Sequence, residues 1–94
     1  MLHTAPVTLH IRNTNHNGDS VLKLSGRIRS DDLSELQMLI ATNNGRVVLD
    51  LEEVNLVDRT VVEYLGLWER DGVELRNSPK WIREWISGEA QNRA

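Results

Sequence analysis

The apolar run in residues 46–51 restricts the possible folds more than any other part of this sequence. In a half-buried strand, apolar residues alternate with polar ones, but the apolar residues of this run mostly follow one another directly. They are Val47, Val48, Leu49 and, after one aspartate, Leu51. Such a run is typical of a strand that helices cover, as they cover the strands of parallel sheets. We therefore predict that residues 46–51 form the central strand of a sheet, packed on at least one side by a helix.

An antiparallel hairpin is predicted before this strand. Residues 6–12 and 20–25 both alternate between apolar and polar side chains, which is the pattern of half-buried strands. The polar stretch 13–19 between them contains Asn17-Gly18, a strong signal for a tight turn. Two adjacent strands joined by such a loop most simply pair with each other in opposite directions.

Three helices are predicted from apolar residues that recur at helical spacing. The first begins near Ser30 and stops at residues 43–45, the second covers residues 59–71, and the third begins at residues 78–79 and ends at Gly88. Each end carries a residue type that favours starting or stopping a helix, such as serine before it or glycine after it.

The remaining segments complete a small α/β domain. A short strand is predicted at residues 73–76, connecting loops at 26–30 and 52–57, and a frayed tail at 89–94. The order β-β-α-β-α-β-α implies parallel strands joined by right-handed crossovers, in addition to the antiparallel N-terminal hairpin. We predict a single domain over the 94 residues, with a core from about residue 7 to 86 and a small mixed β-sheet packed against helices.

The composition argues against several classes of function. The net charge is -3, with 11 Lys and Arg against 14 Asp and Glu and no basic stripe, so nucleic-acid binding is not expected. The absence of cysteine removes disulfide scaffolds and thiol chemistry. No apolar run approaches the roughly 18 residues of a spanning helix, and residues 1–6 lack the features of a signal peptide. We expect a soluble, cytoplasmic protein without membrane insertion.

The sequence has no recognisable catalytic, metal or cofactor motif. His3, His10 and His16 lack the helical spacing of metal ligands. There is no glycine-rich phosphate loop and no serine in a nucleophile elbow. We therefore expect no metal and no cofactor, and we predict a protein that works by binding another protein and is not an enzyme.

The junction at Asp58 is the strongest candidate for a functional site. Asp58 opens the helix predicted at residues 59–71, where its carboxylate can accept backbone N–H groups as an N-cap. This structural role is the simpler interpretation. The functional interpretation is that a loop held by a rigid sheet presents a recognition surface.

The tryptophans of the last predicted helix also have two possible interpretations, packing in the core or binding a partner. Trp81 and Trp85 lie one helical turn apart, with Ile82 and Ile86 beside them, so core packing is the expected role. The alternative is that part of this last helix stays open and is covered by a partner, or by a second copy of the chain in a homodimer.

At this point the chain resembles a known family. The segment VLKLSGRI, the helix after it, the segment RVVLDLEEVNLVD and the helix that follows look like the STAS domain of anti-sigma factor antagonists. The resemblance covers about residues 7–86. It rests on the order of elements, on Gly26 after the second strand, and on the pattern D-L-x-x-V-x-x-V-D from Asp50 to Asp58. It implies a bacterial regulator of transcription and signal transduction that binds an anti-sigma kinase and is switched by serine phosphorylation.

The junction departs from the family pattern at the switch itself. The family reads Asp, Ser, Ser or Thr, Gly, whereas this chain reads Asp58, Arg59, Thr60, Val61. Arg59 stands at the phospho-acceptor position and cannot take a phosphate, but its guanidinium could pair with a carboxylate or phosphate of a partner. Thr60 keeps a hydroxyl and is the alternative phosphorylation site. We therefore expect binding to a regulatory protein without the usual serine switch.

The expected binding surface joins the loops around this junction to the outer face of the second helix. The residues predicted to contact a partner are Gly26, Asn55, Asp58, Arg59, Thr60 and Glu63. Two alternatives stay open. STAS-like proteins also resemble small cytoplasmic subunits that dock on transporter ATPases, and some resemble domains that bind nucleotides or other small ligands.

Overall fold

The computed structural model describes residues 8–43 and 45–92, and within them it confirms the predicted α/β fold class and order of elements. The chain runs in the order β1 (His10–His16), β2 (Asp19–Ile28), the 3-10 turn η1 (Ser30–Asp32), α1 (Leu33–Ala41), β3 (Val47–Val57), α2 (Arg59–Arg70), β4 (Glu74–Arg76) and α3 (Lys80–Asn92).

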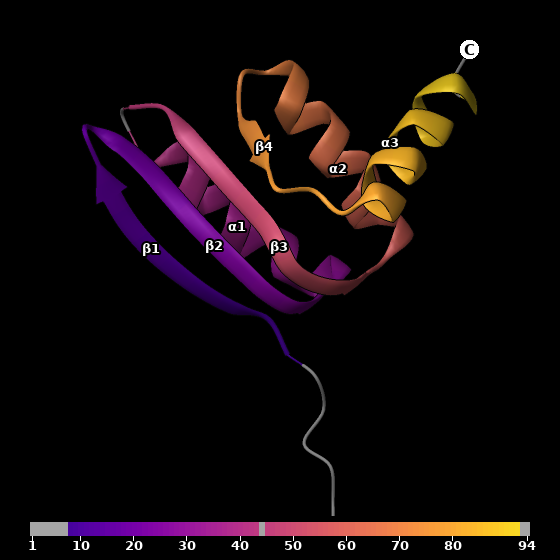
Figure 1. Cartoon of the computed structure of the whole chain (residues 1–94), viewed down its shortest axis with the longest axis horizontal. Helices are drawn as coiled ribbons and strands as arrows, with labels where there is room; N and C mark the ends of the chain where they lie inside the picture. Colours follow the sequence, from indigo (N-terminus) through magenta and orange to yellow (C-terminus); the bar gives the residue numbers. More distant parts are fainter. Residues whose placement is uncertain (1–7, 44, 93–94) are drawn as a thin grey trace, which may run out of the picture.

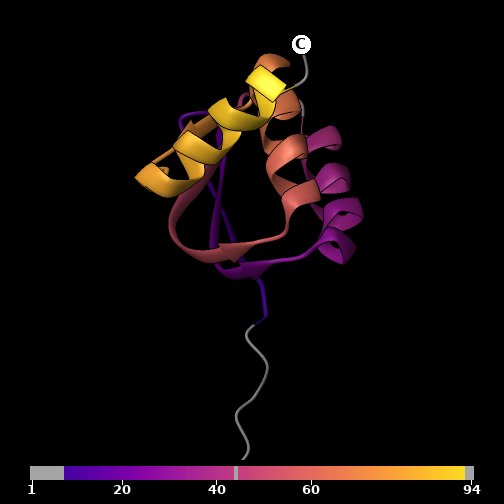
Figure 2. The ribbon, with the colours of Figure 1, turned by 90° about the vertical axis from the view of Figure 1, so that its right-hand side faces the viewer.

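The strands form one mixed sheet in the order β1-β2-β3-β4. β1 and β2 are antiparallel, while the pairs β2–β3 and β3–β4 are parallel. Both parallel crossovers advance in the same direction across the sheet, and right-handed crossovers of this kind place their helices on the same face. Figures 1 and 2 show α1 and α2 together on that face, with α3 beside α2.

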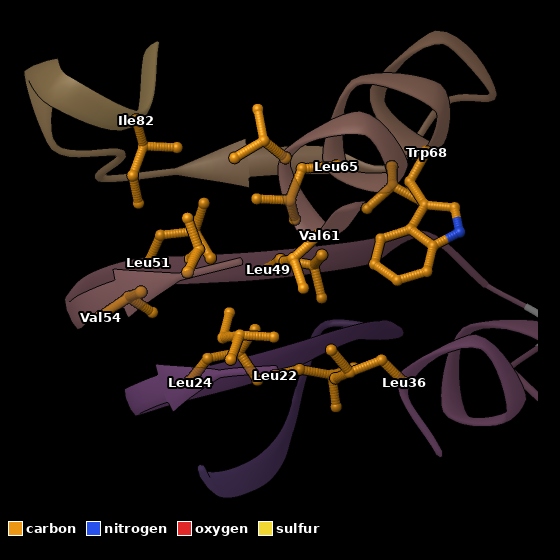
Figure 3. Packing of buried hydrophobic residues seen from close by; sticks show 14 of the residues in the cluster. Leu22, Leu24, Leu36, Leu49, Leu51, Val54, Val61, Leu65, Trp68 and Ile82 are labelled. Carbon is orange, nitrogen blue, oxygen red and sulfur yellow. The ribbon is translucent and has the colours of Figure 1, made fainter. Parts of the chain in front are cut away.

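The hydrophobic core lies between the sheet and its helices. Leu22 and Leu24 of β2 are fully buried, whereas Lys23 between them points to the opposite face and pairs with Glu53 at 3.7 Å. Figure 3 shows Leu49 and Leu51 of β3 facing α2 across this core. The alternation along β2 is the expected result of side chains that point to opposite faces in turn.

The apolar run that begins β3 is buried as predicted. Val48 has no exposed surface, although its side chain belongs to the face away from Leu49. In the paired register it lies between Val21 of β2 and Glu74 of β4.

The N-terminal hairpin differs from its prediction. The predicted strand began at residue 6, but within the described residues β1 begins at His10, and the polar residues 13–16 that were expected to be a loop are part of it. Asn17 and Gly18, with φ of 53° and 88°, form the two-residue turn. A turn of this kind requires the residues on either side to pair, and this register extends β1 through the polar stretch. Pro6 and Val7 lie outside the described residues.

Two further segments were wrongly expected to be loops. β2 continues through residues 26–28, and β3 continues through residues 52–57, because Val54 and Val57 are buried against the core. β2 and β3 stay paired as far as Ile28 and Val57, with register irregularities on the way.

The predicted end of the third helix is also wrong. α3 continues through Gly88 to Asn92, so residues 89–92 are helical and do not form a frayed tail; residues 93–94 lie outside the described chain. Trp85 packs against the core, but Trp81 is 40% exposed, so core packing was the wrong expectation for Trp81. In the part of the chain that the structure describes, no helix is long and apolar enough to cross a membrane.

Candidate functional site

The candidate site lies where β2 and β3 end side by side. Ile28 and Val57 are partners in the parallel register, so the chain leaves both strands at the same end of the sheet, where their carboxyl ends lie. η1 begins at Ser30 after β2, and α2 begins at Arg59 after β3. The carboxyl edge of parallel strands is where loops and helix starts gather in α/β folds, and where such folds commonly bind other molecules.

Asp58 connects the two loops at this edge. Its backbone N–H donates to the carbonyl of Ile28 at 3.1 Å. Its carboxylate accepts hydrogen bonds from the Ser30 backbone N–H at 3.0 Å and from the Ser30 hydroxyl at 3.4 Å. The other carboxylate oxygen lies 3.2 Å from the Arg27 guanidinium. One side chain therefore holds the end of β2, the start of η1 and the start of α2 together.

This arrangement corrects the predicted N-cap. Asp58 does occupy the N-cap position of α2, with an extended backbone at φ -79° and ψ 156°. Its side chain, however, makes no capping hydrogen bond to the first turn of α2. The carboxylate instead faces Ser30 and Arg27, and it accepts hydrogen bonds from the N–H groups of these two residues.

The surroundings of Asp58 favour its ionised form. The hydrogen bond from the Ser30 backbone N–H holds the pKa of this carboxyl below its usual value of 3.8, and Arg27 lowers the pKa further. Partial burial acts in the opposite direction and is outweighed. At neutral pH the carboxylate is therefore charged and remains a strong acceptor for both partners.

Four of the predicted contact residues come together here. Asn55 is exposed near the end of β3, Asp58 is half-buried, and Arg59 and Thr60 are exposed in the first turn of α2. The Arg59 side chain is 69% exposed, and its guanidinium lies 3.3 Å from the Glu89 carboxylate of α3. The cation predicted to face a partner thus already has an acidic neighbour within its own chain.

The other two predicted residues lie away from the junction. Gly26 is inside β2, with a φ of 91°, at an irregularity in the pairing with β3. Its role there is conformational, because few residues other than glycine adopt this backbone geometry. Glu63 lies one helical turn beyond Arg59 and lines a groove between α2 and α3.

This α2–α3 groove encloses about 210 Å³. Its apolar lining comes from Val62, Gly66, Leu67 and Ile86. On its charged side, Arg83 of α3 makes two hydrogen bonds to the Glu69 carboxylate of α2, at 2.8 and 3.2 Å. These paired charges join the two helices to each other.

Two features of the junction escaped the sequence reasoning. Leu56 is 49% exposed between Asn55 and the buried Val57, which makes it an apolar contact point on the surface. The available signal was the adjacent apolar pair Leu56-Val57, because consecutive residues of a strand point to opposite faces and only one of the two can face the core. The pairing of Arg59 with Glu89 gave no signal, because it depends on a helix that was expected to end one residue earlier, at Gly88.

Neither metal-binding clusters nor relatives add a second indication of function. Among residues 8–43 and 45–92, no group of three or more His, Asp or Glu side chains is placed to hold a metal ion. Comparison of the chain with protein-family models gives no match, and comparison with curated proteins gives none either.

Proposed function

We propose that this protein is a protein-binding module of the anti-sigma factor antagonist type, and that its binding surface is the junction of β2, η1, β3 and α2. The observation that carries the proposal is the set of contacts made by Asp58. Its carboxylate joins Ser30 and Arg27 to the start of α2, so two loops form one connected surface.

The side chains that this surface presents suit protein recognition. Leu56 supplies exposed apolar area, while Asn55 and Thr60 beside it supply hydrogen-bonding groups at the surface. Protein interfaces combine an apolar centre with a polar rim in this way. The regulatory partner implied by the family resemblance is an anti-sigma kinase or a protein of similar kind.

The proposed module works without the usual serine switch. Arg59 occupies the phospho-acceptor position and pairs with Glu89, so this position carries a fixed positive charge in place of a hydroxyl. Thr60 is exposed in the first turn of α2, where a helix N-terminus favours an added phosphate. Phosphorylation in the first turn of α2 would therefore act through Thr60.

The test is affinity capture from the native cell with Leu56→Asp as the diagnostic variant. Leu56 is exposed, so the substitution is expected to leave the fold intact while placing a charge at the centre of the surface. Met38→Asp is the matched control, because Met38 is an exposed apolar residue, 65% accessible, on α1 outside the junction. Both variants are first compared with wild type by circular dichroism and thermal unfolding.

The expected result is a regulatory protein that wild type and Met38→Asp retain and that Leu56→Asp loses. The captured protein is then titrated against all three forms, and its affinity for Leu56→Asp should fall by at least about tenfold. Equal capture by all three forms, or no specific protein captured by wild type, would overturn the proposal. Mass spectrometry of the bait reads any phosphate on Thr60 in the same experiment.

A further inference from the structure

The outer side of β1 has no paired strand among the described residues, although β1 is seven residues long. β1 is an edge strand whose seven residues all pair with β2, without a bulge. The opposite edge is β4, which is only three residues long. Figure 1 shows β1 running along the outside of the sheet, with β2 on its inner side and no described segment along its outer side.

The geometry of the hairpin tells which backbone groups point outward. The two-residue turn makes His16 and Asp19 a hydrogen-bonded pair, and such pairs alternate along an antiparallel ladder. Thr14, Arg12 and His10 therefore exchange hydrogen bonds with β2. The N–H and C=O groups of Ile11, Asn13 and Asn15 face away from it, along the free edge.

This edge lacks the features by which proteins usually prevent strand addition. β1 contains no proline, no lysine and no bulge, and Arg12 is its only residue other than histidine that can carry a charge. Short length, proline, charge or a bulge would each discourage another strand from pairing here. A regular seven-residue edge with one arginine and no proline, lysine or bulge is a template for one more strand.

We propose that the occupant of this edge is β1 of a second copy of the chain, paired antiparallel about a two-fold axis at Asn13. In this register each copy's Asn13 faces the other's, and Ile11 faces Asn15, so all three outward-facing residues of both strands are hydrogen-bonded. The result is one continuous sheet through both copies. The inference rests on β1 alone and is independent of the proposed function of the junction.

The side chains of β1 fit this register. On the face away from the core, His10 lies opposite the second copy's His16, and Arg12 lies opposite its Thr14. Centring the pairing on Arg12 would instead place the two guanidiniums directly opposite each other, which is unfavourable. Pairing about Asn13 therefore satisfies the most backbone groups and avoids the main like-charge contact.

The test measures association of the full chain from roughly 10 µM to roughly 0.5 mM by sedimentation, together with amide hydrogen exchange. The expected result is a monomer–dimer equilibrium in which the amides of Ile11, Asn13 and Asn15 become protected as the dimer forms. The amides of Arg12 and Thr14 serve as an internal control, because β2 already protects them in the monomer. A chain that stays monomeric at the highest concentration would overturn the proposal, and so would a dimer that leaves the three amides unprotected.

Two variants locate the contact. Asn13→Pro removes an N–H that faces outward and is not bonded to β2, so it should abolish the dimer, whereas Asn13→Ala keeps the N–H and should still dimerise. Thr14→Lys places an ammonium opposite Arg12 of the other copy, twice per dimer, and should weaken the dimer about tenfold relative to Thr14→Gln. If Asn13→Pro fails to fold, the Thr14 pair decides. A dimer that the charge leaves unchanged would refute the β1 pairing, as would addition of another protein's strand with no self-association.

Discussion

Ile82→Ala is expected to remove a large part of the folding free energy, because this side chain fixes α3 to the rest of the protein. Ile82 has no exposed surface. Figure 3 shows it on the α3 side of the core, toward Leu51 of β3 and Leu65 of α2. Truncating a buried isoleucine to alanine costs about 2–5 kcal/mol, and we take about 3 kcal/mol as the central value.

This loss is large on the scale of the whole molecule. A chain of 94 residues is expected to have an unfolding free energy of about 5–14 kcal/mol. Its unfolding entropy near the midpoint is about 0.2 kcal/mol/K, so a loss of about 3 kcal/mol lowers Tm by about 15 °C. The variant should still fold, but with a much narrower margin.

The assay is thermal and urea unfolding followed by circular dichroism, with Glu84→Ala as the control. Glu84 is on the same helix, but its side chain is 67% exposed and it pairs with the likewise solvent-facing Lys80 at 3.9 Å. Its loss should change stability by no more than about 0.5 kcal/mol. A Tm for Ile82→Ala within about 3 °C of wild type would show that α3 is not held through this side chain, and the account of the core would be wrong.

Two further predictions concern Asp58 and the glycines. A carboxyl whose pKa is lower in the folded than in the unfolded chain stabilises the fold above its unfolded pKa, near 3.8, and loses this effect as pH falls through the folded pKa. Asp58→Asn should therefore be less stable than wild type at pH 7, with a gap between the urea midpoints that closes in strong acid; a gap that does not change with pH contradicts this. Gly88→Ala should stabilise by about 0.5–1 kcal/mol, because α3 runs through Gly88 and open space surrounds its Cβ position. Gly72→Ala should destabilise because its φ is 107°, and a loss of stability in Gly88→Ala would mean that α3 ends there after all.

The sequence predicted best those elements whose apolar pattern is strong and local. The run at residues 46–51 and the apolar face of Val61, Leu65 and Trp68 correspond directly to buried parts of β3 and α2. Here the pattern and the structure agree because burial of the same side chains determines both.

The errors occur where distant partners overrule the local signal. Residues 13–16 are polar, and only pairing with β2 makes them a strand. Gly88 is a reasonable helix stop by residue type, yet α3 continues past it and Glu89 lies beside Arg59 of α2. A local reading of the sequence cannot weigh such contacts, which form only once the chain has folded.

The candidate site was located from the sequence, but its internal contacts were not. Asp58 was recognised as the residue that opens the second long helix, and the structure places it there. Its hydrogen-bonding partners, Ser30 and Arg27, are 28 and 31 residues away along the chain. Their proximity follows from the register of the parallel pairing of β2 with β3. The order of elements predicted parallel strands, but it does not determine which residues are paired.

The bridge that Asp58 makes between the ends of β2 and β3 also bears on the thermodynamics of any association there. Ordering a loop at an interface costs conformational entropy, which is subtracted from the affinity. Here that entropy is already lost when the chain folds, because the Asp58 carboxylate fixes the end of β2 and the start of α2 in the free protein. A protein that docks on the junction would find the contact groups of this chain already in place. Removing the hydrogen bonds of Asp58 would therefore weaken the complex even if Asp58 itself does not contact the partner.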